Sequence, residues 1–207
     1  MSRKKTFEYF VYDLVKVLGA LPGLIWFRPR YVYESEKAKE KMRGGALVIS
    51  NHGGYCDPIY LLFTLWYRRP QFVCLKKFTE GKMGWLFRAF RCIPIDKENP
   101  GLDTVREVIG RLKDGNVVVI FPEGSVNLEN DSISQFKSGV SLMAMKSGKP
   151  VVPVFIREKK HWYERLTVII GERVEAAGTP MTFGSMDGFA ELLLERERGL
   201  KNISDNL

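Results

Sequence analysis

Apolar runs of strand length alternate with helix-length segments along most of this chain, and that alternation constrains its fold more than any other feature. The run 117–121 is apolar at every position, which is typical of a strand buried on both faces of a sheet. In the segment 103–114, apolar residues instead recur at helical spacing, and Gly115 follows. We therefore expect an α/β fold, in which helices flank a layered, mostly parallel or mixed sheet.

The same pattern places the remaining elements. We expect strands at residues 46–49, 72–75, 92–95, 117–121, 151–156 and 166–170. We expect helices at residues 35–43, 57–67, 79–90, 103–114, 133–147 and 187–201. Asp57 precedes Pro58 and is expected to be the N-cap of its helix, and Thr79 is expected to cap the next one. No low-complexity linker interrupts the pattern, so residues 31–207 are expected to form one domain.

Composition narrows the classes of function. The chain has 207 residues, 45% of them hydrophobic, which excludes a disulfide-stapled mini-protein and a disordered chain. Its three cysteines leave one unpaired in any disulfide scheme, which fits a reducing compartment. The spacing of the three cysteines is not that of metal ligands, so we expect no metal site. No other feature of the sequence suggests an organic cofactor, and none is expected. A net charge of +8 favours a polyanionic partner: nucleic acid, an anionic membrane surface or a phosphate-bearing small molecule.

The N-terminal residues 1–30 have the pattern of a helix that lies on a membrane. The longest uncharged run in their apolar stretch, residues 17–27, has eleven residues, whereas a spanning helix needs about 20. At about 100° per residue, Glu8, Asp13 and Lys16 share one sector and leave a wide, aromatic-rich apolar face. We expect an amphipathic, membrane-associating helix in the plane of the interface. A helix packed by its apolar face on its own domain is the alternative.

Polar side chains follow the first predicted strand, where open α/β sheets bind their ligands. His52 and Asp57 flank a Gly-Gly turn there. Histidine suits proton abstraction near neutral pH. If the turn folds Asp57 back onto one ring nitrogen, the other nitrogen is left as a base. In the alternative account, His52 is an ordinary loop residue and Asp57 only caps the helix.

Two further strands end in polar clusters. One leads from Arg91 through an apolar strand to Asp96 and Lys97. The other ends in Glu123, Gly124 and Ser125, where a glycine allows close approach of a ligand to the backbone. Alone, the second of these clusters is weak evidence for a site, because Pro-Glu-Gly is also an ordinary turn sequence.

The order of these clusters resembles the four-motif pattern of the 1-acylglycerol-3-phosphate acyltransferase family, the glycerolipid acyltransferases. The resemblance covers about residues 45–156 and rests on four segments, Asn51-His52 with Asp57, then 93–97, 121–125 and 152–154. It implies that His52 is the general base that deprotonates the acceptor hydroxyl and that Asp57 orients it. The hydroxyl then attacks an acyl thioester directly, without a covalent acyl-enzyme.

The resemblance also implies a set of substrate-binding residues. They are Asp96, Lys97 in place of the usual arginine, Glu123, Gly124 and Ser125 in place of the usual threonine. Arg91, which stands where the family usually has glycine, is added to them as a further substrate-binding residue. The sequence departs from the family at Val126, where many members carry an arginine for the acceptor phosphate. Valine cannot replace an arginine that binds phosphate bidentately. Either Arg91, Lys97, Lys76 or Lys77 supplies the cation, or the acceptor is not a simple phosphate monoester.

Three other features have competing interpretations. The segment 65–97 holds eight basic residues and two acidic ones, which suits an anionic lipid surface or a solvated basic face. Its interleaved aromatic residues would also suit single-stranded nucleic acid, but their spacing favours core positions, so no nucleic acid is expected. Cys56 is interpreted as a small filler beside His52 rather than as a nucleophile.

These observations predict a membrane-associated enzyme of phospholipid biosynthesis. It would move a fatty acyl group from acyl-CoA or acyl carrier protein to the free hydroxyl of a lysophospholipid. The acceptor that the resemblance favours is 1-acylglycerol-3-phosphate (lysophosphatidic acid), whose acylation gives phosphatidic acid. We expect it on the cytoplasmic side of a membrane, peripheral or monotopic. The alternatives are a family member with another lipid acceptor, which Val126 favours, and a non-catalytic lipid-binding protein on the same scaffold.

Overall fold

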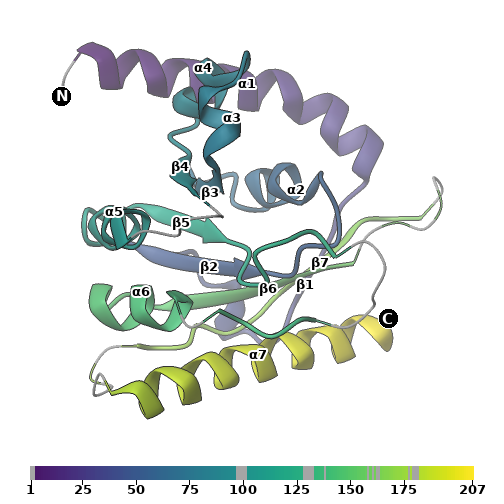
Figure 1. Cartoon of the computed structure of the whole chain (residues 1–207). Helices are drawn as coiled ribbons and strands as arrows, with labels where there is room; N and C mark the ends of the chain where they lie inside the picture. The colour runs from purple at the N-terminus through teal and green to yellow at the C-terminus, as the bar shows by residue number, and fades with distance from the viewer. Residues whose placement is uncertain are drawn as a thin grey trace.

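The computed structural model shows how these segments are arranged around one sheet (Figure 1). It describes residues 3–96, 102–127, 133–137, 139–157, 159, 161, 164–176, 178 and 182–207.

Seven strands form a single sheet in the order β1-β7-β6-β2-β5-β3-β4. The strands are β1 (Arg30–Tyr33), β2 (Ala46–Ser50), β3 (Gln71–Leu75), β4 (Ile93–Ile95), β5 (Val117–Ile120), β6 (Val151–Arg157) and β7 (Thr167–Ile170). Only β6 and β7 pair antiparallel among the described strands, and all other neighbours are parallel. The predicted mostly parallel, mixed α/β sheet is therefore confirmed.

Helices cover both faces of this sheet (Figure 1). They are α1 (Arg3–Phe27), α2 (Asp57–Thr64), α3 (Lys76–Glu80), α4 (Gly84–Ala89), α5 (Leu102–Lys113), α6 (Gly139–Ser147) and α7 (Phe183–Asp205), with a short 3₁₀ helix at Lys37–Lys39. Strand β2 alternates between two cores, because successive side chains of a strand point to opposite faces. Leu47 and Ile49 pack with α5, α6 and α7, whereas Ala46 and Val48 pack with α1 and α2.

Several predicted boundaries differ from the structure. Strand β1 was not predicted, because its four residues are mostly exposed and carry no apolar run. Cys56, not Asp57, is the N-cap residue of α2, because the Asp57 carboxylate is turned back toward His52. Thr79 lies inside α3, where its hydroxyl donates to the carbonyl of Lys76, and so it caps nothing.

Two predicted helices are shorter than their sequence patterns. The segment 79–90 forms parts of α3 and α4, which are separated around Gly81. Helix α6 begins at Gly139, and residues 133–137 are not helical. The amide of Ser134 in this segment donates to the Glu123 carboxylate (3.1 Å), a bond that holds the chain away from a helical path.

Helix α1 contacts the domain through polar atoms as well as through the rings of Tyr12 and Phe27. Tyr12 Oη donates to the carbonyl of Pro70 (2.9 Å), and Lys16 Nζ donates to the carbonyls of Trp66 (2.6 Å) and Arg68 (2.7 Å). Both Tyr12 and Lys16 are almost fully buried, at 1% and 5% exposure. Of the charged sector predicted from the sequence, Lys16 and Asp13, which pairs with Arg69, therefore face the domain, and the Glu8 side chain lies outside the described residues.

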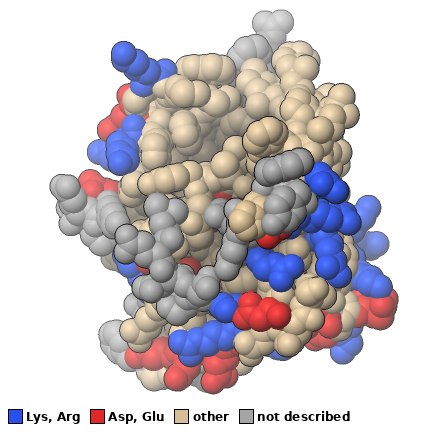
Figure 2. Space-filling view, turned by 90° about the vertical axis from the view of Figure 1, so that its right-hand side faces the viewer, with Lys and Arg blue, Asp and Glu red and all other residues tan. Residues whose placement is uncertain are grey.

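The opposite face of α1 is apolar and lies open to solvent. Its large side chains are 44–72% exposed, namely Phe10, Leu14, Val17, Leu18, Leu21, Leu24, Ile25 and Trp26. Figure 2 shows a broad uncharged surface over the upper part of the molecule, with Lys and Arg side chains below it and at its margins. This arrangement contradicts the alternative in which the apolar face packs on its own domain.

Helix α1 is also bent. Pro22 lies within it, and its two arms, Tyr9–Gly19 and Leu21–Phe27, meet at 44°. Among the described residues no single helix is long and apolar enough to cross a bilayer, and only these two arms together reach that length and hydropathy.

Candidate active site

The predicted polar clusters lie along one edge of the sheet. Strands β2, β3, β4, β5 and β6 run parallel, so their carboxyl ends all face the same way. Asn51 and His52 follow β2, and Phe121 to Glu123 follow the neighbouring strand β5. This edge is where ligands bind in open α/β sheets.

His52 and Asp57 form a hydrogen-bonded pair at this edge. His52 Nδ1 lies 2.9 Å from Asp57 Oδ2, which also accepts from the amide of Gly54 (3.0 Å). Because Nδ1 faces a carboxylate, Nδ1 carries the ring proton and Nε2 presents its lone pair. Nε2 has no hydrogen-bond partner among the residues that the structure describes. The pair therefore has the geometry of a base with its orienting acid, as the sequence predicted.

The pair is shielded unequally from water. The Asp57 side chain is fully buried, whereas that of His52 is 16% exposed. The imidazole stacks on the ring of Phe121, with centroids 4.0 Å apart and planes inclined by 17°. Asp57 therefore acts on His52 from a region of low dielectric, where its charge has most effect, while the imidazole edge remains accessible.

Backbone contacts fix the loop that carries His52. The side chain of Asn51 makes two hydrogen bonds to the backbone of Ile156 in β6, as the backbone of a neighbouring strand would. Asn51 Oδ1 accepts from the Ile156 amide (2.8 Å), and Asn51 Nδ2 donates to the Ile156 carbonyl (3.0 Å). The carbonyl of His52 accepts from the amide of Asn127 (2.8 Å). Sequence reasoning placed Asn51 in a motif but found no role for it. An amide side chain directly after a buried strand was the only available signal.

Glu123 braces the same loop. One carboxylate oxygen accepts from the amide of His52 (3.2 Å) and the other from the amide of Ser134 (3.1 Å). The side chain is 9% exposed, so these two bonds are made in a shielded place. Glu123 thus ties the loop after β5 to the loop after β2, and both loops to the segment 133–137.

Glu197 of α7 lies near this brace. It is fully buried, and neither of its carboxylate oxygens has a partner among the described residues. Burial, and to a lesser extent the charge of Glu123, raises the pKa of Glu197 well above its usual range.

Gly124 and Lys137 lie together at the mouth of the site. Gly124 has φ +71°, in the left-handed region that favours glycine. Atoms Cε and Nζ of Lys137 lie 2.9 Å from the position that a Cβ on residue 124 would occupy. Lys137 is exposed, so its amine borders the site from the solvent side. No pattern in the sequence pointed to Lys137, which stands in a segment predicted to be helix.

The other predicted binding residues are spread along the sheet edge. Ser125 is exposed beside Gly124. Lys76 and Lys77 follow β3, which lies two strands from β2, or about 10 Å at the usual strand spacing. Asp96 follows β4, one strand further out. Lys97 lies outside the described residues.

The structure does not bring Arg91 together with His52. Arg91 precedes β4 and therefore lies toward the amino end of the parallel strands, opposite the edge that carries His52. Its Nη1 donates to Tyr9 Oη of α1 (2.7 Å). The described part of the chain holds no group of three or more His, Cys, Asp or Glu side chains placed to bind a metal ion.

The chain is similar to known acyltransferases. The sequence model of the family described as "Acyltransferase" matches residues 30–157. The 1-acyl-sn-glycerol-3-phosphate acyltransferase of Bacillus subtilis (strain 168) is 26% identical over 96% of this chain and 98% of its own length. The enzyme of that name from Streptococcus pneumoniae is 26% identical over 78% of this chain, which spans 57% of that relative.

A solved structure shows the same fold. It is the 1-acyl-sn-glycerophosphate (LPA) acyltransferase PlsC from Thermotoga maritima, with a TM-score of 0.69 over 99% of this chain and 84% of that one. The two sequences are 21% identical.

Proposed function

The chain belongs to the acyltransferase family, and from that premise we propose that it acylates 1-acyl-sn-glycerol 3-phosphate to phosphatidic acid. The donor is a fatty acyl thioester, either acyl-CoA or acyl carrier protein, and no metal or organic cofactor takes part. The observation that carries the proposal is the hydrogen-bonded His52–Asp57 pair at the carboxyl edge of the sheet.

The reaction follows from the orientation of the imidazole. His52 Nε2 takes the proton of the acceptor hydroxyl as its oxygen attacks the thioester carbonyl. Asp57, held against Nδ1–H, stabilises the imidazolium that forms. The tetrahedral intermediate then collapses, the carbon–sulfur bond breaks, and the imidazolium returns its proton to the departing thiolate. The products are the ester and a free thiol.

The proposal is tested by acceptor choice. Purified protein with a radiolabelled acyl thioester should acylate 1-acylglycerol 3-phosphate in preference to lysophosphatidylcholine, lysophosphatidylglycerol and monoacylglycerol. Preference for another lysophospholipid would favour the second candidate, a family member with a different acceptor, to which Val126 points. Lipid binding without any product would favour a non-catalytic lipid-binding protein.

Lys137 is the cation that we assign to the acceptor phosphate in place of an arginine at residue 126. Its Nζ lies at Gly124, within the third motif, whereas Arg91 lies at the opposite end of the strands. An ammonium group binds phosphate as a point charge, without the bidentate geometry of arginine.

We therefore expect Lys137→Met to raise KM for 1-acylglycerol 3-phosphate by about 10- to 100-fold, because this is the usual loss of affinity when a hydrogen bond to a charged group is removed. The value of kcat should change little. Steady-state kinetics measure this split. Lys146→Met, which removes an exposed lysine from the end of α6, is the matched control. An unchanged KM would remove Lys137 from the acceptor site.

The membrane contact that we propose is the exposed face of α1. An interfacial helix buries its apolar face at the boundary of head groups and acyl chains, and eight large apolar side chains of α1 point outward. The basic side chains that follow β3, Lys76 and Lys77, would lie near anionic head groups on the cytoplasmic face.

The double variant Leu18→Glu/Ile25→Glu should lower partition into anionic vesicles at least ~10-fold, because each buried apolar side chain contributes roughly 1.5–3 kcal/mol. Vesicle sedimentation measures the partition. The control is Leu192→Glu, which alters an exposed leucine on α7, at the other face of the sheet. Equal loss in the control, or no loss in the double variant, would contradict the assignment of α1.

A further inference from the structure

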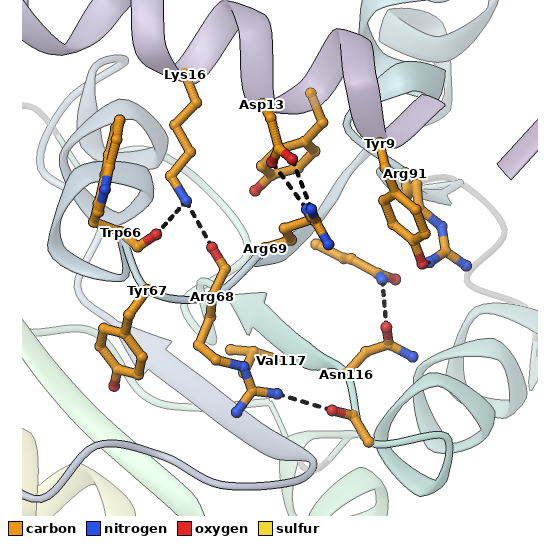
Figure 3. Close-up of a pocket in the computed structure, with 13 residues that line it drawn as sticks. Tyr9, Asp13, Lys16, Trp66, Tyr67, Arg68, Arg69, Arg91, Asn116 and Val117 are labelled. Carbon is orange, nitrogen blue, oxygen red and sulfur yellow. Dashed lines mark hydrogen bonds and ion pairs between the residues drawn. The ribbon is translucent and has the colours of Figure 1, made fainter. Parts of the chain in front are cut away.

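A cavity lies between α1 and the amino ends of β3 and β5 (Figure 3). Its volume is about 390 Å³. Residues that precede or begin these strands line it, among them Gln71 and Asn116. Because the strands are parallel, this cavity is at the opposite end of the sheet from His52.

The lining of this cavity carries an excess of positive charge. Lys16, Arg68, Arg69 and Arg91 contribute four cations against the single acid Asp13. Lys16 and Arg68 donate hydrogen bonds to backbone carbonyls. The guanidinium of Arg69 is paired with the Asp13 carboxylate through Nη2–Oδ2 (2.6 Å) and Nε–Oδ1 (2.9 Å).

Arg91 is different from these three cations. Its guanidinium makes only one hydrogen bond within the described residues, to Tyr9 Oη, although the group carries five N–H donors. Its backbone has φ +54°, a conformation that costs a non-glycine residue free energy and that recurs at functional sites. Arg91 therefore has donors to spare for an anion in the cavity.

The cavity also contains an unpaired acceptor. Gln71 is 2% exposed, and its Oε1 has no hydrogen-bond partner among the described residues. The orientation of this amide follows from its neighbours: Asn116 Nδ2 donates to the carbonyl of Arg111, so Asn116 Oδ1 must accept from Gln71 Nε2 (3.0 Å). A buried carbonyl oxygen without a donor is unfavourable, and a ligand hydroxyl would satisfy it.

Aromatic side chains form the walls and the rim. Trp66 and Tyr67 are about half exposed at 44% and 40%, whereas Tyr12 is buried. The inward face of α1, which bounds the cavity, would lie at head-group level if its outward face rests on a bilayer. A lipid head group or a small soluble molecule has access from there.

We propose that this cavity binds a glycerophosphate group, with Arg91 donating to the phosphate and Gln71 Oε1 accepting from a glycerol hydroxyl. The group comes either from the head group of an anionic lipid or from free glycerol 3-phosphate. Only the lipid source rests on the membrane contact proposed above. The cavity is a site separate from the acyl-transfer centre.

The test is calorimetric titration of the full chain with sn-glycerol 3-phosphate. Wild-type protein should bind it saturably, and Arg91→Gln should raise Kd at least ~10-fold, since a hydrogen bond to a charged partner is lost. Arg106→Gln removes an equal charge from the exposed surface of α5 and should leave Kd unchanged. His52→Ala should also leave Kd unchanged, because it alters the other end of the sheet.

A second arm identifies the source of the ligand. Binding to phosphatidylcholine vesicles is compared with and without phosphatidylglycerol, for wild type and Arg91→Gln. Arg91-dependent binding confined to phosphatidylglycerol vesicles assigns the cavity to a lipid head group, and Arg91-dependent binding of glycerol 3-phosphate alone assigns it to a metabolite. If circular dichroism shows that Arg91→Gln does not fold, Gln71→Met replaces it, because this change removes the other proposed contact with the ligand at nearly the same side-chain volume and should also raise Kd.

Two outcomes would overturn the proposal. One is the absence of any Arg91-dependent binding in both arms. The other is binding of glycerol 3-phosphate that His52→Ala removes and Arg91→Gln leaves intact, which would place the ligand in the acyl-transfer centre. Loss of acyl transfer in His52→Ala with Arg91-dependent binding retained would separate the two sites.

Discussion

Replacing His52 with alanine is expected to lower kcat by about two to four powers of ten, the usual contribution of a general base. The expectation rests on the 2.9 Å contact between Nδ1 and Asp57, which leaves Nε2 to take the proton of the acceptor. The loop should survive the change, because the bonds that fix it come from the backbone of His52 and from the side chains of Asn51 and Glu123. Release of free thiol from the donor measures turnover.

The chain offers a matched control for this experiment. His161→Ala removes the other histidine, which is exposed and lies outside the motifs. Its turnover should equal that of the wild type, and both variants should keep the wild-type melting temperature and vesicle binding. Turnover within about tenfold of wild type in His52→Ala would contradict the assignment, since base catalysis is worth more than that.

Asp57→Asn is the second large effect that we expect, a loss of about 10²- to 10⁴-fold in kcat with KM little changed. Asparagine fills the same buried space and can still accept the Gly54 amide through its oxygen. It lacks the charge that stabilises the imidazolium. If its amide nitrogen instead takes the place of Oδ2, the bond from the Gly54 amide is lost and the ring takes the wrong tautomer.

Asp103→Asn serves as the control for this change, because that carboxylate is almost fully exposed at the start of α5. Stability must be measured beside kinetics, since Asp57 is buried and a misfolded variant would also be inactive. A folded Asp57→Asn protein with wild-type kcat would show that the carboxylate only caps the turn, as in the alternative account.

The buried centre of the fold could be predicted because its sequence signals are local. Every residue from 117 to 120 is apolar, so both faces of the strand that they form are apolar, and this strand, β5, is fully buried. The edge strand β1 had no such signal: its residues are mostly exposed, and it was not predicted. Helix α6 was predicted six residues too early, because the pairing of Ser134 with Glu123 is a long-range contact that no local pattern contains.

The candidate site was predicted in part for a similar reason. His52 and Asp57 are joined by one turn, so their spacing in the sequence reflects their contact in space. Arg91 and Asp96 are also close in sequence, but a strand lies between them and carries them to opposite ends of the sheet. Lys137 reaches Gly124 from thirteen residues away, a contact that depends on the non-helical path of the segment 133–137.

The short connection after α1 has a mechanical consequence. Only Arg28 and Pro29 separate the last residue of α1 from the first residue of β1, which is hydrogen-bonded into the sheet beside β7. The hydrogen bonds of Tyr12 and Lys16 and this short connection together prevent the helix from rotating independently of the strands. If α1 rests in a bilayer as proposed, the depth of the helix would set the height of His52 above the acyl chains, and that height would decide which carbon of a lipid's glycerol comes level with the imidazole.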